Sequence, residues 1–347
     1  MIKDATLLAS WMALYDAALN FKKIEPWKWM YDDELFGVQD PVSGEIGYCC
    51  ILGNLEEVFA LNVYLGAEGL FGHRIMQCYR DGDPKDDLVL VQKCLMASFE
   101  DRGRLVKEDL DIIKALGFKF RGKNAWPMFQ NYQPGYFPWF LTNDDIPFLT
   151  TALEQALEVV LRCRDDKSLI TTDRDDLFFV RMPEIENNTV VWRDSYQQPA
   201  HFSIAIPDDG HFDEVGLQRL LKNIKKRSGT WEFDLFHYPE PIRDGEERPC
   251  FPYTYLVMDH KSGLALDMEI ISLAGYVKKA RDRIISLVER TKSFPEQIQV
   301  RNGRAFDILK PIVDKLGVKL SKVVKLPHLE MCRQELVKSL SRGQRGY

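Results

Sequence analysis

The densest group of side chains that could bind a metal ion or take part in catalysis lies at residues 208–213. Asp208, Asp209 and His211, followed by Asp213, bring hard oxygen ligands and an imidazole together. Such groups bind divalent metal ions in hydrolases. The same residues stand where a helix over 211–226 is expected to begin, and capping and the helix dipole favour Asp there. We favour the capping interpretation, which leaves Asp208, Asp209 and His211 as metal candidates only and predicts no cofactor.

Two further histidines stand near acidic residues. His237 and His260 are expected near the ends of neighbouring strands, beside Asp234, Glu240 and Asp259. A histidine beside a carboxylate can transfer protons in catalysis. Polar residues at strand ends are the commoner explanation, so we assign no catalytic role.

Known catalytic and nucleotide-binding motifs do not match. The segment from Gly117 to Asn124 has the spacing of a phosphate-binding loop, but a helix is expected before it and Asn124 replaces the required hydroxyl. The acidic loop at 81–87 lacks the glycine and glutamate of a calcium-binding loop. No G-x-S-x-G, G-x-G-x-x-G or Glu-x-Lys occurs. The chain is therefore predicted to be a non-enzymatic binding or protein-interaction protein, with a metal-dependent hydrolase near Asp208 and His211 as an alternative.

Charge is distributed unevenly along the chain. Residues 277–347 hold 17 Lys and Arg against 7 Asp and Glu, although the whole chain has a formal net charge of −6. A basic segment can bind nucleic acid, or it can be attracted to the acidic remainder of the same molecule. We favour the second interpretation and keep a nucleic-acid-associated protein as an alternative. The candidate phosphate contacts are Lys222, Lys225, Lys226, Arg227, Arg333, Lys338 and Arg342.

Hydrophobic patterning predicts an α+β fold. Strand-like segments joined by Pro-Gly, Asn-Asn, Asp-Gly and Ser-Gly turns alternate with amphipathic helices, such as those expected over 4–22 and 143–163. This favours mixed or antiparallel sheets with flanking helices. A strand–helix–strand–helix pattern after residue 295 predicts a small α/β unit. The predicted domains are 1–165, 177–292 and 295–347.

The composition predicts a soluble cytoplasmic protein. The first helix carries Asp4 and Asp16 and does not resemble a signal peptide. No apolar run is long enough to span a membrane. The seven cysteines are scattered without a C-x-x-C pair, so we expect buried free thiols in a reducing compartment.

Three segments carry a resemblance to a known family. PWKWMYDDELFGVQDPVSGEIGYCCILG, followed by EVFALNVYLGAEGL, resembles the opening of a family of uncharacterised bacterial proteins known as domains of unknown function. The tail PEQIQVRNGRAFDILKPIVDKLGVKLSKVVKLPHLE is similar to the second conserved unit of that architecture, and the middle segment GEERPCFPYTYLVMDHKSGLALD is also compatible with it. The resemblance implies a bacterial or phage cytoplasmic protein. It implies no activity, so no functional residue follows from it.

Overall fold

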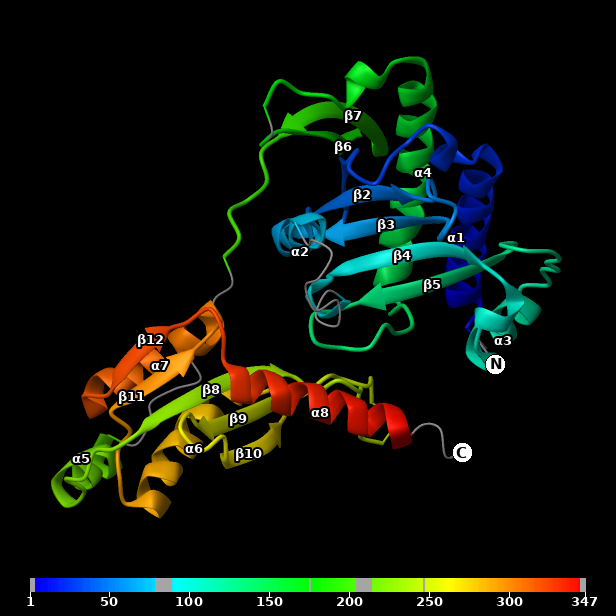
Figure 1. Ribbon diagram of the computed structural model, residues 1–347. Helices are drawn as coiled ribbons and strands as arrows, with labels where there is room; N and C mark the ends of the chain where they lie inside the picture. Colours follow the sequence, from blue (N-terminus) through cyan, green and yellow to red (C-terminus); the bar gives the residue numbers. More distant parts are fainter. Residues whose placement is uncertain (1–3, 79–88, 175, 204–213, 246, 344–347) are drawn as a thin grey trace. The chain divides into compact units, whose positions relative to one another are not determined.

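The chain folds into two compact units, at residues 1–203 and 204–347. The computed structural model describes residues 4–78, 89–174, 176–203, 214–245 and 247–343 (Figure 1). Within these residues, helices and two sheets confirm the predicted α+β class. No helix in the described part is long and apolar enough to cross a membrane.

The N-terminal unit is built on a seven-stranded sheet with the order β5-β4-β3-β2-β1-β6-β7. All neighbours pair antiparallel except β1 and β6, which are parallel. Its strands are β1 (Phe36–Gln39), β2 (Ile46–Leu52), β3 (Ala60–Leu65), β4 (Cys94–Glu100), β5 (Trp126–Tyr132), β6 (Phe178–Glu186) and β7 (Thr189–Gln197), and its α-helices are α1 (Ala5–Ile24), α2 (Gly66–Cys78), α3 (Lys107–Ala115) and α4 (Asp145–Asp165).

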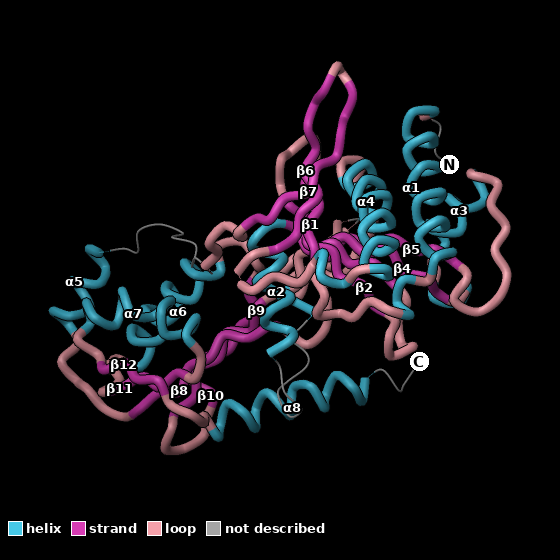
Figure 2. Tube along the Cα trace, turned by 90° about the horizontal axis from the view of Figure 1, so that it is seen from above, coloured by secondary structure: helices cyan, strands magenta, loops and turns pink. Residues whose placement is uncertain are grey.

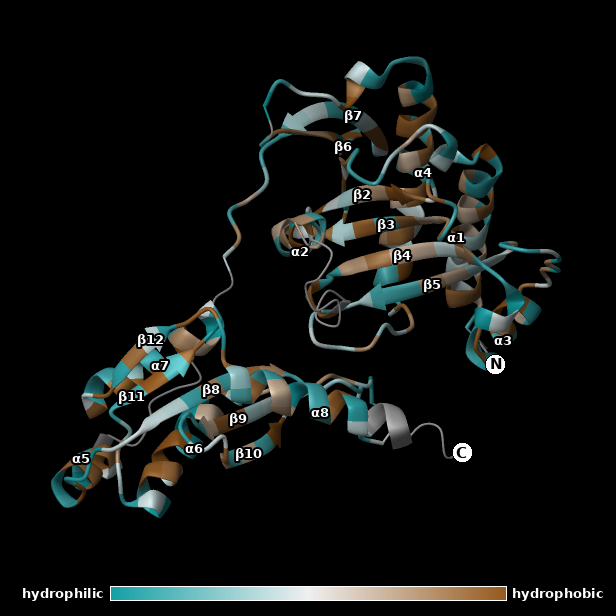
Figure 3. Cartoon of the chain, in the orientation of Figure 1, coloured by the Kyte–Doolittle hydropathy of each residue, from teal (hydrophilic) through white to brown (hydrophobic). Residues whose placement is uncertain are grey.

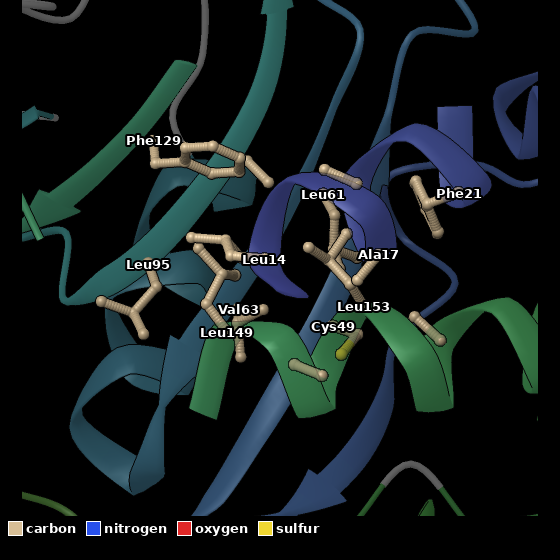
Figure 4. Close-up of a cluster of buried hydrophobic side chains, with 14 of the residues drawn as sticks. Leu14, Ala17, Phe21, Cys49, Leu61, Val63, Leu95, Phe129, Leu149 and Leu153 are labelled. Carbon is tan, nitrogen blue, oxygen red and sulfur yellow. The ribbon is translucent and has the colours of Figure 1, made fainter. Parts of the chain in front are cut away.

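One face of this sheet packs against α1 and α4. Strands place alternate side chains on opposite faces, so Leu61 and Val63 of β3 face the two helices. Figure 4 shows them beside Leu14 of α1 and Leu153 of α4. All four side chains are buried, so the largest core of the chain forms here. In Figure 3 the strands β2 to β4 are largely hydrophobic, which reflects this burial.

The short helix α2 approaches its neighbours unusually closely. Gly66, Gly69 and Gly72 recur every third residue along it. A Cβ atom added at Gly69 would lie 2.5 Å from the carbonyl oxygen of Lys93, and one at Gly72 would lie 2.5 Å from that of Val91. The helix therefore packs against backbone, and only glycine leaves the necessary space.

The parallel pair β1–β6 joins segments that are far apart in the sequence. Gly37 lies opposite Val180, and β6 continues into a hairpin with β7 that turns at Asn187 and Asn188. Both asparagines have positive φ, which asparagine tolerates better than most residues. Figure 2 shows this hairpin extending past the neighbouring strands. The hairpin at the predicted turn is confirmed.

The C-terminal unit is a five-stranded sheet between helices, with the order β10-β9-β8-β11-β12. β8, β9 and β10 are antiparallel, whereas β11 runs parallel to β8 and β12. Figure 2 shows α6 and α7 on one side of this sheet and α8 on the other. The strands are β8 (Thr230–His237), β9 (Tyr253–Asp259), β10 (Ala265–Ile271), β11 (Gln297–Val300) and β12 (Lys319–Lys322), and the helices are α5 (Glu214–Asn223), α6 (Tyr276–Thr291), α7 (Gly303–Leu316) and α8 (Pro327–Gly343).

This division differs from the three predicted domains. The hairpin 178–197 belongs to the first sheet, because β6 pairs with β1. The predicted unit 295–347 completes the second sheet, because β11 pairs with β8. Both differences come from parallel pairing, which links segments that local sequence patterns do not connect. The charged stretch at 164–176 is the connection from α4 to β6 and does not separate two domains.

The seven cysteines carry free thiols in the described residues. Cys49, Cys50, Cys94 and Cys163 are buried, whereas Cys78 is exposed. Burial raises the pKa of the Cys49 and Cys94 thiols far above the usual value, and raises that of Cys163 to about 11. These buried thiols therefore stay protonated and unreactive at neutral pH.

Candidate functional site

The predicted metal candidates cannot be placed in the fold. Asp208, Asp209 and His211 lie outside the described residues, and the acidic loop at 81–87 does too. Across the described ranges, no three His, Cys, Asp or Glu side chains come together in a way that could hold a metal ion. α5 is described from Glu214 onward, so the capping interpretation stays a prediction.

Two of the four predicted basic residues at the end of α5, Lys225 and Arg227, bond to backbone carbonyls. The guanidinium of Arg227 donates to the carbonyl oxygens of Leu316 (2.8 Å) and Gly317 (2.9 Å), where α7 ends, and lies over the ring of Phe294. Lys225 Nζ donates to the carbonyl of Leu221 (2.9 Å), one turn back in α5. Cations at helix C-termini stabilise the helix dipole. Lys222 and Lys226 are exposed beside them.

The basic residues of α8 lie on another part of the same unit. Arg333 lies over the ring of Phe236, with 4.9 Å between the guanidinium carbon and the ring centroid, and Lys338 pairs with Glu335 at 3.0 Å. The side chain of Arg342 is not described. Both Figure 1 and Figure 2 show α5 well apart from α8. The six candidates whose side chains are described therefore do not form one patch.

We expect weak nucleic-acid binding from this arrangement. A dispersed set of cations neutralises few phosphates at once, so the dissociation constant for mixed DNA or RNA should stay in the nonspecific range, about 10⁻⁴ to 10⁻⁶ M at physiological salt. Fluorescence anisotropy at low and at moderate salt measures it. A submicromolar dissociation constant with a steep salt dependence would contradict this expectation and restore the nucleic-acid interpretation.

The structure reveals a row of buried polar side chains on β8 that the sequence did not single out as a site. Trp231, Phe233 and Leu235 point to the core formed with α6 and α7. The alternating residues Glu232 and Asp234 point to the opposite face, where α8 lies, and are buried although charged. The alternation of apolar and acidic residues in WEFDLF indicated that the strand has a polar face. It did not show that a helix distant in the sequence covers this face.

Glu232 connects three segments of the C-terminal unit. Its side chain is 0% exposed; one carboxylate oxygen lies 2.6 Å from His260 Nδ1, and the other accepts the backbone N–H of Leu329 at 3.3 Å. Leu329 stands in the first turn of α8, where a negative charge stabilises the helix dipole. The ring of His328 lies 6.3 Å from that of His260. Glu232 therefore anchors the start of α8 to the sheet.

Asp234 lies two residues after Glu232, on the same face of β8. Its Oδ1 accepts the side-chain N–H of Asn302 (2.7 Å) and the backbone N–H of Leu235 (2.9 Å). Asn302 follows β11 and caps α7, accepting the N–H of Ala305 at 2.6 Å. Burial raises the pKa of the Asp234 carboxyl above its usual value, and the nearby cations Arg301 and Arg333 only partly offset this.

We therefore expect Asp234→Asn to stabilise the protein at neutral pH. The folded-state pKa is raised, so the stability contributed by Asp234 is fully present below the unfolded-state pKa and is lost as pH rises through the folded-state value. Asparagine keeps an oxygen for Asn302 without the charge. The variant should unfold at a higher urea concentration than the native chain at pH 7 and at nearly the same one near pH 3.5. A lower midpoint at pH 7 would contradict the expectation.

His237 and His260 lie near the ends of neighbouring strands, as expected, but they do not come together in one site. β8 and β9 run antiparallel, with Trp231 opposite Asp259 and His237 opposite Tyr253, so the two histidines lie at opposite ends of the pair. His237 stacks on Tyr253, and its Nδ1 lies 2.8 Å from the carbonyl of Phe251. The carboxylate beside His260 is Glu232, twenty-eight positions away in the sequence.

Chemically, the Glu232–His260 pair can hold an imidazole in a fixed orientation. The His260 side chain is 47% exposed while its carboxylate partner is fully buried. An oriented imidazole can take up or release a proton. The second carboxylate oxygen accepts the N–H of Leu329, so the same carboxylate also bonds the start of α8.

A second surface feature lies at the edge strand β10. Met268 and Ile270 are 43% and 42% exposed and share the sheet face of Leu256 and Thr254, which lie opposite them on β9. Among the described strands, β10 pairs only with β9. A cavity of about 400 Å³ runs along its end and the start of α6, and Ile270 and Lys279 are among its lining residues. We call Met268 and Ile270 the β10 strip.

Two known domain families match this chain, one in each unit. Residues 11–181 match a family described as a domain of unknown function, DUF7309, and residues 216–337 match a second one, DUF6930. No curated protein and no solved structure matches the chain. The resemblance predicted from the sequence is thereby confirmed: two domains of unknown function follow one another in this chain.

Proposed function

We propose that the protein acts by binding another protein and not by catalysis, and that the β10 strip is where the partner docks. The observation that carries the proposal is the exposure of two large apolar side chains side by side on an edge strand. Partly exposed apolar residues in a contiguous group are typical of interaction sites. Of the two groups that resemble a catalytic pair, Glu232 also bonds the backbone of α8 at Leu329.

A photo-crosslinking amino acid in place of Met268 tests this in the source organism. We expect an adduct with a specific protein that does not form from the same group at Val42, an exposed apolar residue of the N-terminal unit. The purified partner should bind the double variant Met268→Lys/Ile270→Lys at least tenfold more weakly, because each lost apolar contact contributes roughly 1.5 kcal/mol or more. Equal crosslinking at both positions, or equal binding by the variant, would refute the proposal.

We also propose that the protein works in the bacterial cytoplasm. The free, buried thiols support this, because a reducing compartment keeps cysteines unpaired. Fractionation of cells of the source organism tests it: recovery of the chain from the periplasm or the medium would contradict the proposal.

A further inference from the structure

We infer that His260 is a phosphorylation site, at which the ring nitrogen Nε2 takes a phosphoryl group from a phosphoramidate, a donor whose phosphorus is bound to nitrogen. The observation that carries the inference is a half-exposed imidazole held by a fully buried carboxylate, that of Glu232. The inference goes beyond the proposed binding function and uses none of the residues of the β10 strip.

Glu232 determines which nitrogen of the ring can react. Nδ1 of His260 lies 2.6 Å from one Glu232 oxygen, and a carboxylate only accepts hydrogen bonds, so Nδ1 carries the proton and Nε2 keeps its lone pair. The second Glu232 oxygen accepts the N–H of Leu329 at 3.3 Å, which fixes the carboxylate itself. Nε2 lies across the ring from this buried contact. Because 47% of the His260 side chain is exposed, a small donor can reach that edge of the ring.

The neighbours of the ring include groups that stabilise a phosphoryl dianion. The ring of His328, 6.3 Å away, can donate a hydrogen bond to a phosphoryl oxygen. His328 stands in the first turn of α8, a helix of 17 residues whose amino end favours negative charge. Lys261, the next residue after His260, is exposed.

The acidic side chains of the same segments already have donors. Asp259 accepts the backbone N–H of Ser262 at 2.8 Å and its hydroxyl at 2.7 Å. Glu330, in the first turn of α8, lies 3.4 Å from Arg301. These partners partly offset the negative charge that a phosphoryl group would meet beside His260.

The transfer is balanced without a further reactant. The lone pair of Nε2 forms a bond to phosphorus while the P–N bond of the donor breaks, and the electron pair of that bond leaves with ammonia. In the zwitterionic donor the nitrogen already carries the protons that ammonia keeps. The ring becomes positively charged with its proton still on Nδ1, and the carboxylate of Glu232 stabilises this charge. His260 should therefore react faster than an exposed histidine without such a partner.

Reaction of the full-length chain with potassium phosphoramidate tests the inference. The reaction is stopped in alkali, and modified peptides are mapped by mass spectrometry with electron-transfer fragmentation. We expect His260 to be phosphorylated at least tenfold faster than His201, an exposed histidine of the N-terminal unit that serves as the reference in the same sample. Glu232→Gln should slow the reaction of His260 at least tenfold without changing that of His201, because it removes the stabilising charge. Glu335→Gln, on the surface of α8, should leave both rates unchanged.

Equal rates at His260 and His201 in the native chain would overturn the inference, and so would phosphorylation of His328 in place of His260. A His260 rate that Glu232→Gln leaves unchanged would also overturn it. If this variant does not fold, as judged by tryptophan fluorescence, the comparison of the two histidines in the native chain decides. Partner binding is judged separately, by the crosslinking at Met268, so either proposal can fail while the other holds.

Discussion

Gly69→Ala is expected to destabilise the N-terminal unit by about 3 kcal/mol. The new methyl group would lie 2.5 Å from the carbonyl oxygen of Lys93 and 2.7 Å from the carbonyl carbon of Tyr64. Both are backbone atoms, and the Lys93 oxygen already accepts the N–H of Leu65 at 3.0 Å. Relieving the clash therefore requires the helix to move away from the sheet. Alanine is otherwise the better helix former, so a loss of stability would identify the close approach as its cause.

Urea unfolding followed by tryptophan fluorescence measures this effect. Six of the seven tryptophans lie in the N-terminal unit, so its unfolding dominates the signal. Gly103→Ala is the matched control, since a Cβ atom there would meet nothing within 4 Å. We expect that control to change the free energy of unfolding by no more than about 0.5 kcal/mol. Equal stabilities for the two variants would show that α2 does not need the glycine contact.

Glu232→Ala is expected to cost the C-terminal unit about 3 kcal/mol and to loosen α8. The change leaves the N–H of Leu329 and the imidazole of His260 without the fully buried carboxylate that both contact. It also removes a charge from the beginning of α8, where the helix dipole favours it. Hydrogen exchange over residues 327–343 should become faster, because the helix is anchored at that end. Glu232→Gln, which keeps one acceptor oxygen, should show a smaller loss.

The control for this prediction lies on α8 itself. Glu335 pairs with Lys338 on the surface, so Glu335→Ala should change stability by no more than about 0.5 kcal/mol. A Glu232→Ala variant that is as stable as Glu335→Ala, with unchanged exchange in α8, would show that Glu232 does not anchor the helix. Its buried position would then need another explanation.

Helices and turns were predictable because each depends on residues that are close together in the sequence. Turn residues such as Asn187 and Asn188 marked a hairpin, and the apolar spacing around Leu149 and Leu153 marked α4. Proline inside a helix removes a backbone hydrogen bond, yet α7 continues through Pro311 as one helix from Gly303 to Leu316.

The arrangement of the elements was not predictable in the same way. The pairing of Gly37 with Val180 depends on the crossover through α4, which leaves no pattern in either segment. The contact of Glu232 with Leu329 spans 97 positions. The exposure of Met268 and Ile270 depends on which part of the sheet α8 covers. These features arise from tertiary packing, so a single sequence does not specify them.

The parallel pairing of β1 with β6 also has a consequence for synthesis of the chain. During translation, β1 emerges more than a hundred residues before its partner, so one edge of it stays open while β2 to β5 are already available to pair. Long-range pairing of this kind slows folding, and an open edge can capture another nascent chain. The N-terminal sheet is complete only after residues 178–197 have been made. Chains truncated before this hairpin should therefore aggregate through the free edge of β1.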